Sequence, residues 1–437
     1  MFRSLRERNY LIWFLGSLAS NIGTWMQRTA QSWIVLTDLT NHDATALGVV
    51  ISLQFGPQLV LAPMAGVFAD RMSKRKLLIW TQLALGLLAL GLGILVTADL
   101  AELWHVYAFA LGLGIVAALD APARQAFVSE IVDTELLSNA IALNSTSFNG
   151  ARLVGPAVAG VLTVVIGAGP VILVNAATFA LQIVALLIMR RSELLPAPPT
   201  GRGRGQIREG IAYVSKRPDI IAVLVAVFLL GTFGFNFPVF LATMATTEFH
   251  HNADGFGLLN SILAIGSLSG ALMSARRERA RMRVLLISCL LFGVAMLVSA
   301  AAPDFWTYAI TNVAVGFFAL TAMTTANALV QGSVEPTMRG RVMSLYMAIF
   351  LGGTPLGAPL LGLAVSVLGP RATVALGGLS GVIAAILAFL ILRKAGIFAW
   401  RDAARMWSPS APATGIITIS DIPDPVSYTH LTLPTNR

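Results

Sequence analysis

Two arginines interrupt long apolar stretches of the sequence. Arg28 lies within the run 10–36, and Arg152 lies within the run 138–166. A charged side chain is costly inside a bilayer, so an arginine at such a position is by default a candidate functional group. Its guanidinium group suits an anionic or hydrogen-bonding ligand. The alternative for each arginine is a structural pairing with a backbone carbonyl or an amide.

Amide and hydroxyl side chains accompany both arginines. In the first run they recur at intervals of three and four residues, which places them along one stripe of a helix. In the second, two asparagines precede Arg152 by one to two helical turns. The resulting polar set is Asn21, Thr24, Gln27, Arg28, Gln31, Asn144, Asn149 and Arg152.

Other chemistries lack the residues that they need. The single cysteine, Cys289, can form neither an internal disulfide nor a thiolate metal site, and the pair His250 and His251 is expected in a solvated loop. The sequence contains no Gly-x-x-x-x-Gly-Lys-Ser/Thr phosphate loop. We therefore expect no enzyme activity, no cofactor and no metal. Proton coupling is left open, because no Asp or Glu lies deep inside an apolar run and Asp70 and Asp120 are expected at the rim.

Composition and patterning indicate that lipid is the main solvent. Hydrophobic residues make up 56% of the 437 residues, and charged residues make up 12%. About twelve apolar runs have roughly the length that a helix needs to cross a hydrocarbon layer, although the fourth is marginal. They are 10–36, 47–69, 77–97, 104–119, 138–166, 171–189, 220–245, 256–275, 284–302, 305–330, 343–368 and 372–392. The alternating pattern of a membrane barrel is absent, so we predict an all-α membrane protein with twelve transmembrane helices.

The placement of the charges explains the net charge of +9. All but three of the 30 Lys and Arg lie at the N-terminus, in the even-numbered loops or in the tail; the exceptions are Arg371, Arg28 and Arg152. The odd-numbered loops carry acidic residues instead. This positive-inside asymmetry predicts that both termini are cytoplasmic, and it makes nucleic acid the poorer explanation of the positive charge.

A polar interruption divides the runs into two sets of six. We expect an N-terminal bundle over 1–190, a cytoplasmic linker with an amphipathic helix over 191–218, a C-terminal bundle over 219–393 and a disordered cytoplasmic tail over 394–437. Residues 427–437 look like a cloning or sequencing scar and are excluded from functional reasoning. Similar features in both halves, such as Gly66 and Gly270 before basic loops, indicate an internal repeat; compositional drift is the alternative.

The loop after the second run reads Gly66-Val-Phe-Ala-Asp70-Arg71-Met-Ser73-Lys-Arg75-Lys. It resembles the signature loop of the major facilitator superfamily, although the family usually has glycine at the position of Ser73. The resemblance implies two six-helix bundles related by a pseudo-twofold axis, with a substrate site between them. Helix 1 lines and helix 5 flanks that cavity in the family, so the polar set above becomes the candidate substrate site. The implied cytoplasmic latch is Gly66, Asp70, Arg71, Arg75, Asp120 and Arg124, closing toward the start of helix 11.

The fifth run carries Gly150, Gly155, Pro156 and Gly160. These residues resemble part of a glycine- and proline-rich motif of exporters in the superfamily, although Ala159 replaces one glycine of the family pattern. Plain close packing of helices is an equal alternative. Segments such as 120–126, 138–144 and 339–343 resemble the branch that includes the enterobactin exporter.

The resemblance implies a secondary transporter that exports a small amphiphilic or anionic compound, siderophore-like or drug-like, by alternating access. A lipid or lysolipid flippase of the same fold and a non-transporting membrane sensor or scaffold are the alternatives. The expected partners are a small-molecule substrate and the lipid bilayer, with protons as a candidate coupling ion and no nucleic acid. We expect a monomer in a bacterial cytoplasmic membrane.

Overall fold

The computed structural model describes residues 3–195, 206–275, 277 and 280–397. Within these ranges every regular element is helical, and eleven segments are long and apolar enough to cross a membrane. The expected all-α membrane fold is thus confirmed. The tail expected over 394–437 lies outside the described residues from 398 onward.

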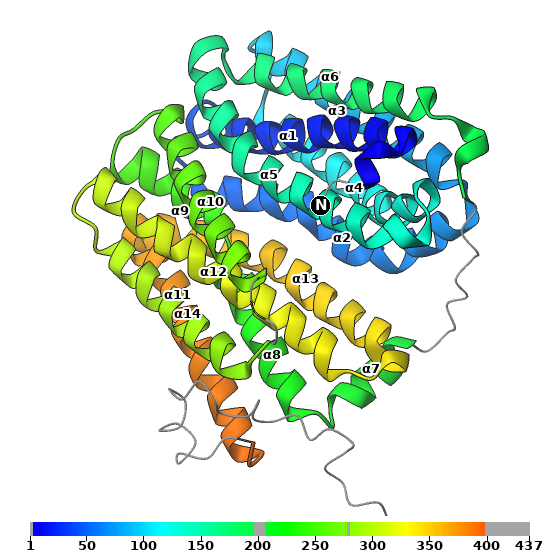
Figure 1. The fold of residues 1–437 in the computed structure, drawn as a ribbon. Helices are drawn as coiled ribbons and strands as arrows, with labels where there is room; N and C mark the ends of the chain where they lie inside the picture. Colours follow the sequence, from blue (N-terminus) through cyan, green and yellow to red (C-terminus); the bar gives the residue numbers. More distant parts are fainter. Residues whose placement is uncertain (1–2, 196–205, 276, 278–279, 398–437) are drawn as a thin grey trace, which may run out of the picture.

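The N-terminal half contains six long helices, shown from blue to green in Figure 1. They are α1 (Arg8–Thr37), α2 (Ala44–Arg71), α3 (Lys74–Thr97), α4 (Leu103–Ile131), α5 (Thr134–Ile166) and α6 (Ala168–Ile188). Helix α1 has 30 residues, which is long enough to span a bilayer. It is absent from the eleven apolar segments, because its Ser, Asn, Gln and Arg side chains lower its hydropathy. It packs against α5 and α6.

Helix α4 is longer than the sequence predicted. The expected run 104–119 ends where the chain becomes polar, but the helix continues through Pro122 to Ile131. Asp120 is therefore a buried residue inside a helix and does not lie in a loop after one. The carboxylate is accommodated there by the hydrogen-bond donors described below.

The C-terminal half begins with an interrupted crossing. It consists of α8 (Pro218–Leu229), the π-helical turn η3 (Leu230–Gly234), α9 (Phe237–Thr243) and the π-helical turn η4 (Met244–Glu248). Glycine, asparagine and proline at Gly234, Asn236 and Pro238 coincide with the break between η3 and α9. The remaining helices are α10 (Ala253–Ala275), α11 (Met282–Ala300), α12 (Phe305–Ser333), α13 (Pro336–Leu368) and α14 (Pro370–Lys394).

The same type of turn occurs in each half. Gly167 joins α5 to α6 with φ of 86°, and Gly369 joins α13 to α14 with φ of 84°. This left-handed conformation favours glycine, which lacks the Cβ atom that would clash. The matching turns support the internal repeat inferred from the sequence.

The linker helix α7 (Gln206–Val214) lies beside the start of α13. Arg341 Nη1 of α13 is 2.9 Å from Glu209 Oε2 of α7. After α7, Arg217 donates to both carboxylate oxygens of Asp219, at 2.9 and 2.7 Å, and to the carbonyl of Ser333 at 3.0 Å. Hydrogen bonding to Asp219 raises the pKa of Arg217 above its usual value. These bonds attach α7 and the start of α8 to α12 and α13.

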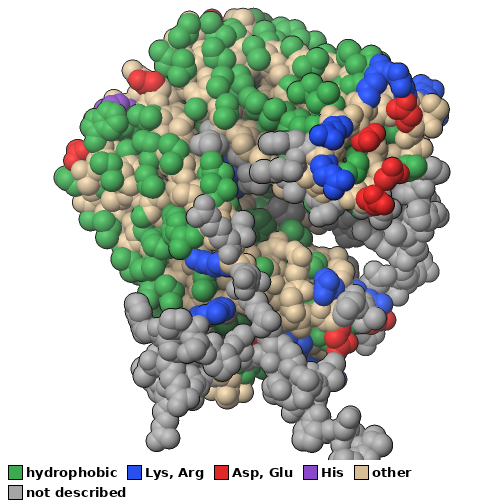
Figure 2. Space-filling view, viewed as in Figure 1, with side chains coloured by type: hydrophobic (Ala, Val, Ile, Leu, Met, Phe, Trp, Pro, Cys, Tyr) green, Lys and Arg blue, Asp and Glu red, His purple; other side chains and the backbone are tan. Residues whose placement is uncertain are grey.

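The two halves meet along two helix pairs, α2 with α13 and α5 with α10. We call the end with the loops 38–43, 98–102, 249–252 and 301–304 the acidic end, and the end with α7 the basic end. Figure 2 shows Lys and Arg side chains on both sides of a hollow between the halves at the basic end.

The closest backbone approaches between the halves lie toward the acidic end. A Cβ atom built on Gly48 of α2 would lie 2.4 Å from the carbonyl oxygen of Ala358 in α13. One built on Gly160 of α5 would lie 2.7 Å from Cα of Gly257 in α10. Ser52 also donates a 2.6 Å hydrogen bond to the carbonyl of Pro355. The halves are therefore joined tightly near the acidic end.

Arg371, the one basic residue expected in an odd-numbered loop, joins three segments at the acidic end. Its Nε donates to Glu248 of η4 at 2.6 Å. Its Nη1 donates to the carbonyl of Ala300, the last residue of α11, at 3.1 Å and to that of Ala302 at 2.5 Å. Its role in the structure is thus to hold the loops of the C-terminal half together.

We expect Arg371→Gln to lower the free energy of unfolding by about 1 kcal/mol. The ion pair is about one third exposed, at 35% for Arg371 and 28% for Glu248, so solvent screens it and the effect stays modest. Thermal unfolding of the solubilised protein measures the change. Arg190→Gln, which breaks the more exposed pair with Glu193, is the control. Equal effects of both substitutions would contradict this role for Arg371.

Candidate functional site

Arg28 and Arg152 converge on one indole ring. The guanidinium carbon of Arg28 lies 5.0 Å from the ring centroid of Trp25 and 4.7 Å from that of Phe55. The guanidinium carbon of Arg152 lies 5.5 Å from the ring of Trp25. Helices α1, α2 and α5 thus bring two cations and two aromatic faces together, an arrangement in which the rings stabilise the positive charges. We call Trp25, Arg28, Phe55 and Arg152 the arginine–aromatic cluster.

The cluster carries an excess of positive charge. In the part of the chain that the structure describes, no carboxylate lies within ion-pair distance of Arg28 or Arg152. The two guanidinium groups instead repel each other. Arg152 is exposed although it lies near the middle of α5, and Arg28 is half-buried. An anion placed between them would offset the repulsion and would supply acceptors for their N–H groups.

Gly155 allows α5 to approach α1 at the cluster. A Cβ atom on Gly155 would lie 2.5 Å from Cβ of Trp25 and 3.0 Å from the carbonyl oxygen of Ile22. Gly160 plays the same part toward α10, and Pro156 is buried between them. Gly150, by contrast, faces open space. The glycine motif of α5 therefore contacts two different helices, and Gly150 has no part in these contacts.

The polar stripe of α1 divides between two environments. Asn21 and Thr24 are half-buried, and Thr24 donates to the carbonyl of Ser20 at 2.8 Å. Gln27 and Gln31 are buried inside the N-terminal half: Gln27 accepts from Asn175 of α6, and Gln31 accepts from Gln54 of α2 at 3.1 Å. These two glutamines hold helices together, so we leave them out of the proposed site. Asn144 is half-buried, and the side chain of Asn149 lies outside the described part.

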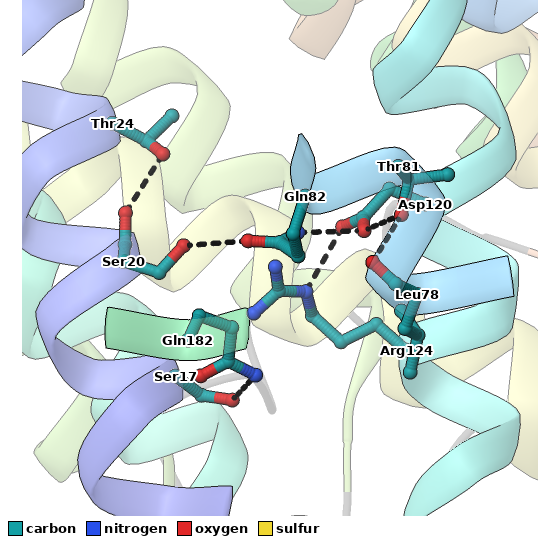
Figure 3. Close-up of polar contacts among 9 residues, drawn as sticks. All are labelled: Ser17, Ser20, Thr24, Leu78, Thr81, Gln82, Asp120, Arg124 and Gln182. Atoms are coloured by element: carbon teal, nitrogen blue, oxygen red, sulfur yellow. Dashed lines mark hydrogen bonds and ion pairs between the residues drawn. The ribbon is translucent and has the colours of Figure 1, made fainter. Parts of the chain in front are cut away.

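Asp120 is the centre of a buried hydrogen-bond network at the basic end, shown in Figure 3. One carboxylate oxygen accepts from Thr81 at 2.7 Å and from Gln82 at 2.8 Å, both on α3. The other accepts from Arg124 Nε at 3.0 Å. Ser20 of α1 lies within 3.4 Å of Gln82 and donates to it. The network therefore joins α1, α3 and α4, and three donors compensate the buried charge.

The other residues of the expected latch have different positions. Arg75 is buried and donates to the carbonyls of Leu186 and Leu187 at the end of α6, at 2.7 and 3.1 Å. It therefore fastens α3 to α6 within the N-terminal half, and we remove it from the latch. The side chains of Gly66, Asp70 and Arg71 lie outside the described part. Arg124 stacks on Trp13 of α1, with its guanidinium carbon 5.7 Å from the ring.

The sequence did not identify five residues of these two groups: Ser20, Trp25, Phe55, Thr81 and Gln82. Trp25 and Phe55 of the cluster lie among other apolar side chains of α1 and α2, so no pattern separates them from lipid-facing or packing side chains. Thr81 and Gln82 are polar residues within the apolar run 77–97. That interruption was a usable signal for a buried polar contact.

A family described as "Transmembrane secretion effector" matches residues 1–411. The chain belongs to this family of major facilitator transporters. Members of the family are transporters and not enzymes, which agrees with the absence of a catalytic motif.

Three curated relatives align over most of the chain. The staphyloferrin A transporter of Staphylococcus aureus is 26% identical, over 87% of this chain and 96% of its own length. The enterobactin exporter of Salmonella typhimurium is 26% identical, over 82% of this chain and 86% of its own. The multidrug efflux pump Tap of Mycolicibacterium fortuitum is also 26% identical, over 83% of this chain and 90% of its own.

Solved structures share the fold. A bacterial homologue of the human lysosomal transporter Spinster, inward-facing and unoccupied, superposes with a TM-score of 0.70 at 15% identity, over 92% of this chain and 100% of that one. A D-xylose–proton symporter superposes with a TM-score of 0.68 at 13% identity, over 87% and 96%. These likenesses agree with a two-bundle major facilitator fold.

Proposed function

We propose that this transporter exports a small anionic or amphiphilic compound and binds it at the arginine–aromatic cluster. The observation that carries the proposal is the convergence of Arg28 and Arg152 on Trp25 without a carboxylate partner in the described chain. The cations select negative charge, and the rings select an aromatic or otherwise flat apolar group. Both features suit siderophore-like and drug-like anions.

The direction of transport is proposed from the charge pattern and the packing of the halves. The positive-inside asymmetry assigns the basic end and both termini to the cytoplasm of a bacterial inner membrane. The close glycine contacts at the acidic end would then seal the outer side, leaving the cluster reachable from the cytoplasm. Rocking of the halves about the cluster would open it to the other side. Two of the relatives carry siderophores by name, which supports the substrate class.

The same proposal also covers the coupling of transport and a cytoplasmic latch. The protein works as a monomer that exchanges its substrate for protons. Asp70, Arg71, Asp120 and Arg124 form a latch at the basic end that closes in one state only, which sets the balance between inward and outward access.

Comparison of secreted metabolites tests the substrate class. Bacterial cells would express either the wild-type protein or the double variant Arg28→Gln/Arg152→Gln, and mass spectrometry would quantify small molecules in the medium and in the cells. We expect anionic compounds to be enriched in the medium and depleted in the cells only with the wild type. Identical profiles, or a change confined to lipids or lysolipids, would refute the proposal, and the second result would favour a flippase.

A further inference from the structure

A cavity lined by both apolar and polar side chains lies in the C-terminal half, away from the arginine–aromatic cluster. It has a volume of about 220 Å³ and lies between the basic ends of α10 and α12. Its walls are three alanines, two threonines (Thr324 and Thr325), Ser274 and Arg277. A water molecule occupies about 30 Å³ in the liquid, so the cavity has room for a group much larger than a single water.

Two hydrogen-bonding atoms in the wall are unused. Ser274 Oγ and Arg277 Nη1 are shielded from solvent and have no hydrogen-bond partner among the residues that the structure describes. Leaving such groups unpaired is costly, and the cost is larger for a charged group. The residues described as lining the cavity include no carboxylate. Within the described part of the wall, the positive charge of Arg277 is therefore not neutralised.

In the N-terminal half, by contrast, an arginine near the basic end has an acidic partner. There, at the basic end of α4, the carboxylate of Asp120 accepts from Arg124. In the C-terminal half the corresponding stretch of α12 offers the hydroxyl groups of Thr324 and Thr325. Thr324 already donates to the carbonyl of Leu320 at 2.8 Å. Arg277, which follows α10, therefore has no acidic residue of α12 beside it, whereas Arg124 of α4 has Asp120.

We propose that this cavity binds a phosphate group, with Arg277 and Ser274 as donors. A phosphate brings negative charge and several acceptor oxygens, which suits a guanidinium group beside a hydroxyl. The cavity lies near the ends of two membrane helices. The sequence around Arg277 is rich in arginine. Basic pockets between transmembrane helices at the cytoplasmic surface are suited to phospholipid headgroups. The phosphate can belong to a lipid or to a soluble compound.

The test uses the full-length protein, purified in an uncharged detergent. Thermal unfolding is followed during titration with inorganic phosphate, with chloride at matched ionic strength as reference. Native mass spectrometry counts bound phosphatidylglycerol in a parallel arm. Arg277→Gln removes the proposed donor, and Ala328→Leu fills the cavity while keeping every charge. Arg281→Gln removes a charge from the same loop, at a position that does not line the cavity.

We expect Arg277→Gln and Ala328→Leu to weaken binding at least about tenfold, the loss expected for one charge-assisted hydrogen bond. Arg281→Gln should bind like the wild type. Saturable stabilisation by inorganic phosphate would assign the site to a soluble phosphate compound, and retention of phosphatidylglycerol alone would assign it to a lipid. No binding of either probe, or equal losses in Arg277→Gln and Arg281→Gln, would overturn the proposal. Because the cavity is separate from the cluster, either result leaves the proposed transport function standing.

Discussion

Replacing Arg28 by glutamine is expected to reduce transport efficiency roughly tenfold to a hundredfold. The loss follows from the removal of one charge-assisted contact with an anionic substrate, worth about 1.5–3 kcal/mol. Arg28 lies 4.7 Å from the ring of Phe55 and 5.0 Å from that of Trp25, so the side chain is held at the cluster before substrate arrives. Initial rates of transport at several substrate concentrations measure the effect.

Two further variants show whether charge or shape matters at this position. Arg28→Lys keeps the charge but lacks the planar group that stacks on aromatic rings, so it should recover only part of the activity. Arg8→Gln makes the same change as Arg28→Gln at an exposed position near the start of the same helix and should leave transport unchanged. Full activity of Arg28→Gln with an anionic substrate would exclude Arg28 from the site.

Asp120→Asn is expected to have the second large effect, a loss of stability approaching the 3–5 kcal/mol typical of breaking a buried ion pair. Asparagine removes the charge that pairs with Arg124 and leaves that guanidinium group uncompensated. The amide oxygen can still accept from Thr81 and Gln82, which both point at one oxygen of Asp120, but the NH2 group, a donor, would then face the donor Nε of Arg124. Thermal unfolding of the solubilised protein measures the loss.

The double variant Asp120→Asn/Arg124→Gln removes both charges and should be more stable than Asp120→Asn alone. Asp133→Asn, at an exposed position before α5, is the matched control. The latch proposal requires an additional change, a shift in access to the two sides, which cysteine labelling at the acidic end can follow in a Cys289→Ser background. If Asp120→Asn matched Asp133→Asn in both stability and labelling, neither the network nor the latch would be supported.

The sequence was sufficient to predict the fold class and the two charged residues that define the candidate site. Long apolar runs require helices in lipid, and an arginine inside such a run is conspicuous. The prediction was less accurate for polar residues whose hydrogen-bond partners are distant in the sequence and come close only in the fold. The run 104–119 was ended before Asp120, because nothing in the sequence shows that α3 provides donors for this carboxylate.

Helical periodicity also has a specific limit in the polar stripe of α1. It places Thr24, Gln27, Arg28 and Gln31 close together, but it does not say which neighbouring helix faces each of them. The structure turns Gln27 toward α6 and Gln31 toward α2, and it leaves Arg28 at the cluster. The break before α9 had a signal in the sequence that the prediction did not use, because Gly234, Asn236 and Pro238 interrupt the otherwise largely apolar run 220–245.

Uptake into inverted membrane vesicles tests the central claim most directly. Vesicles containing the wild type or Arg28→Gln would receive catecholates, lipophilic drugs and lysolipids, with and without a proton gradient. We predict gradient-dependent accumulation of an anionic compound by the wild type, and loss of that accumulation in Arg28→Gln. Equal accumulation by both proteins, or movement of lysolipids alone, would contradict export of an anion through the arginine–aromatic cluster.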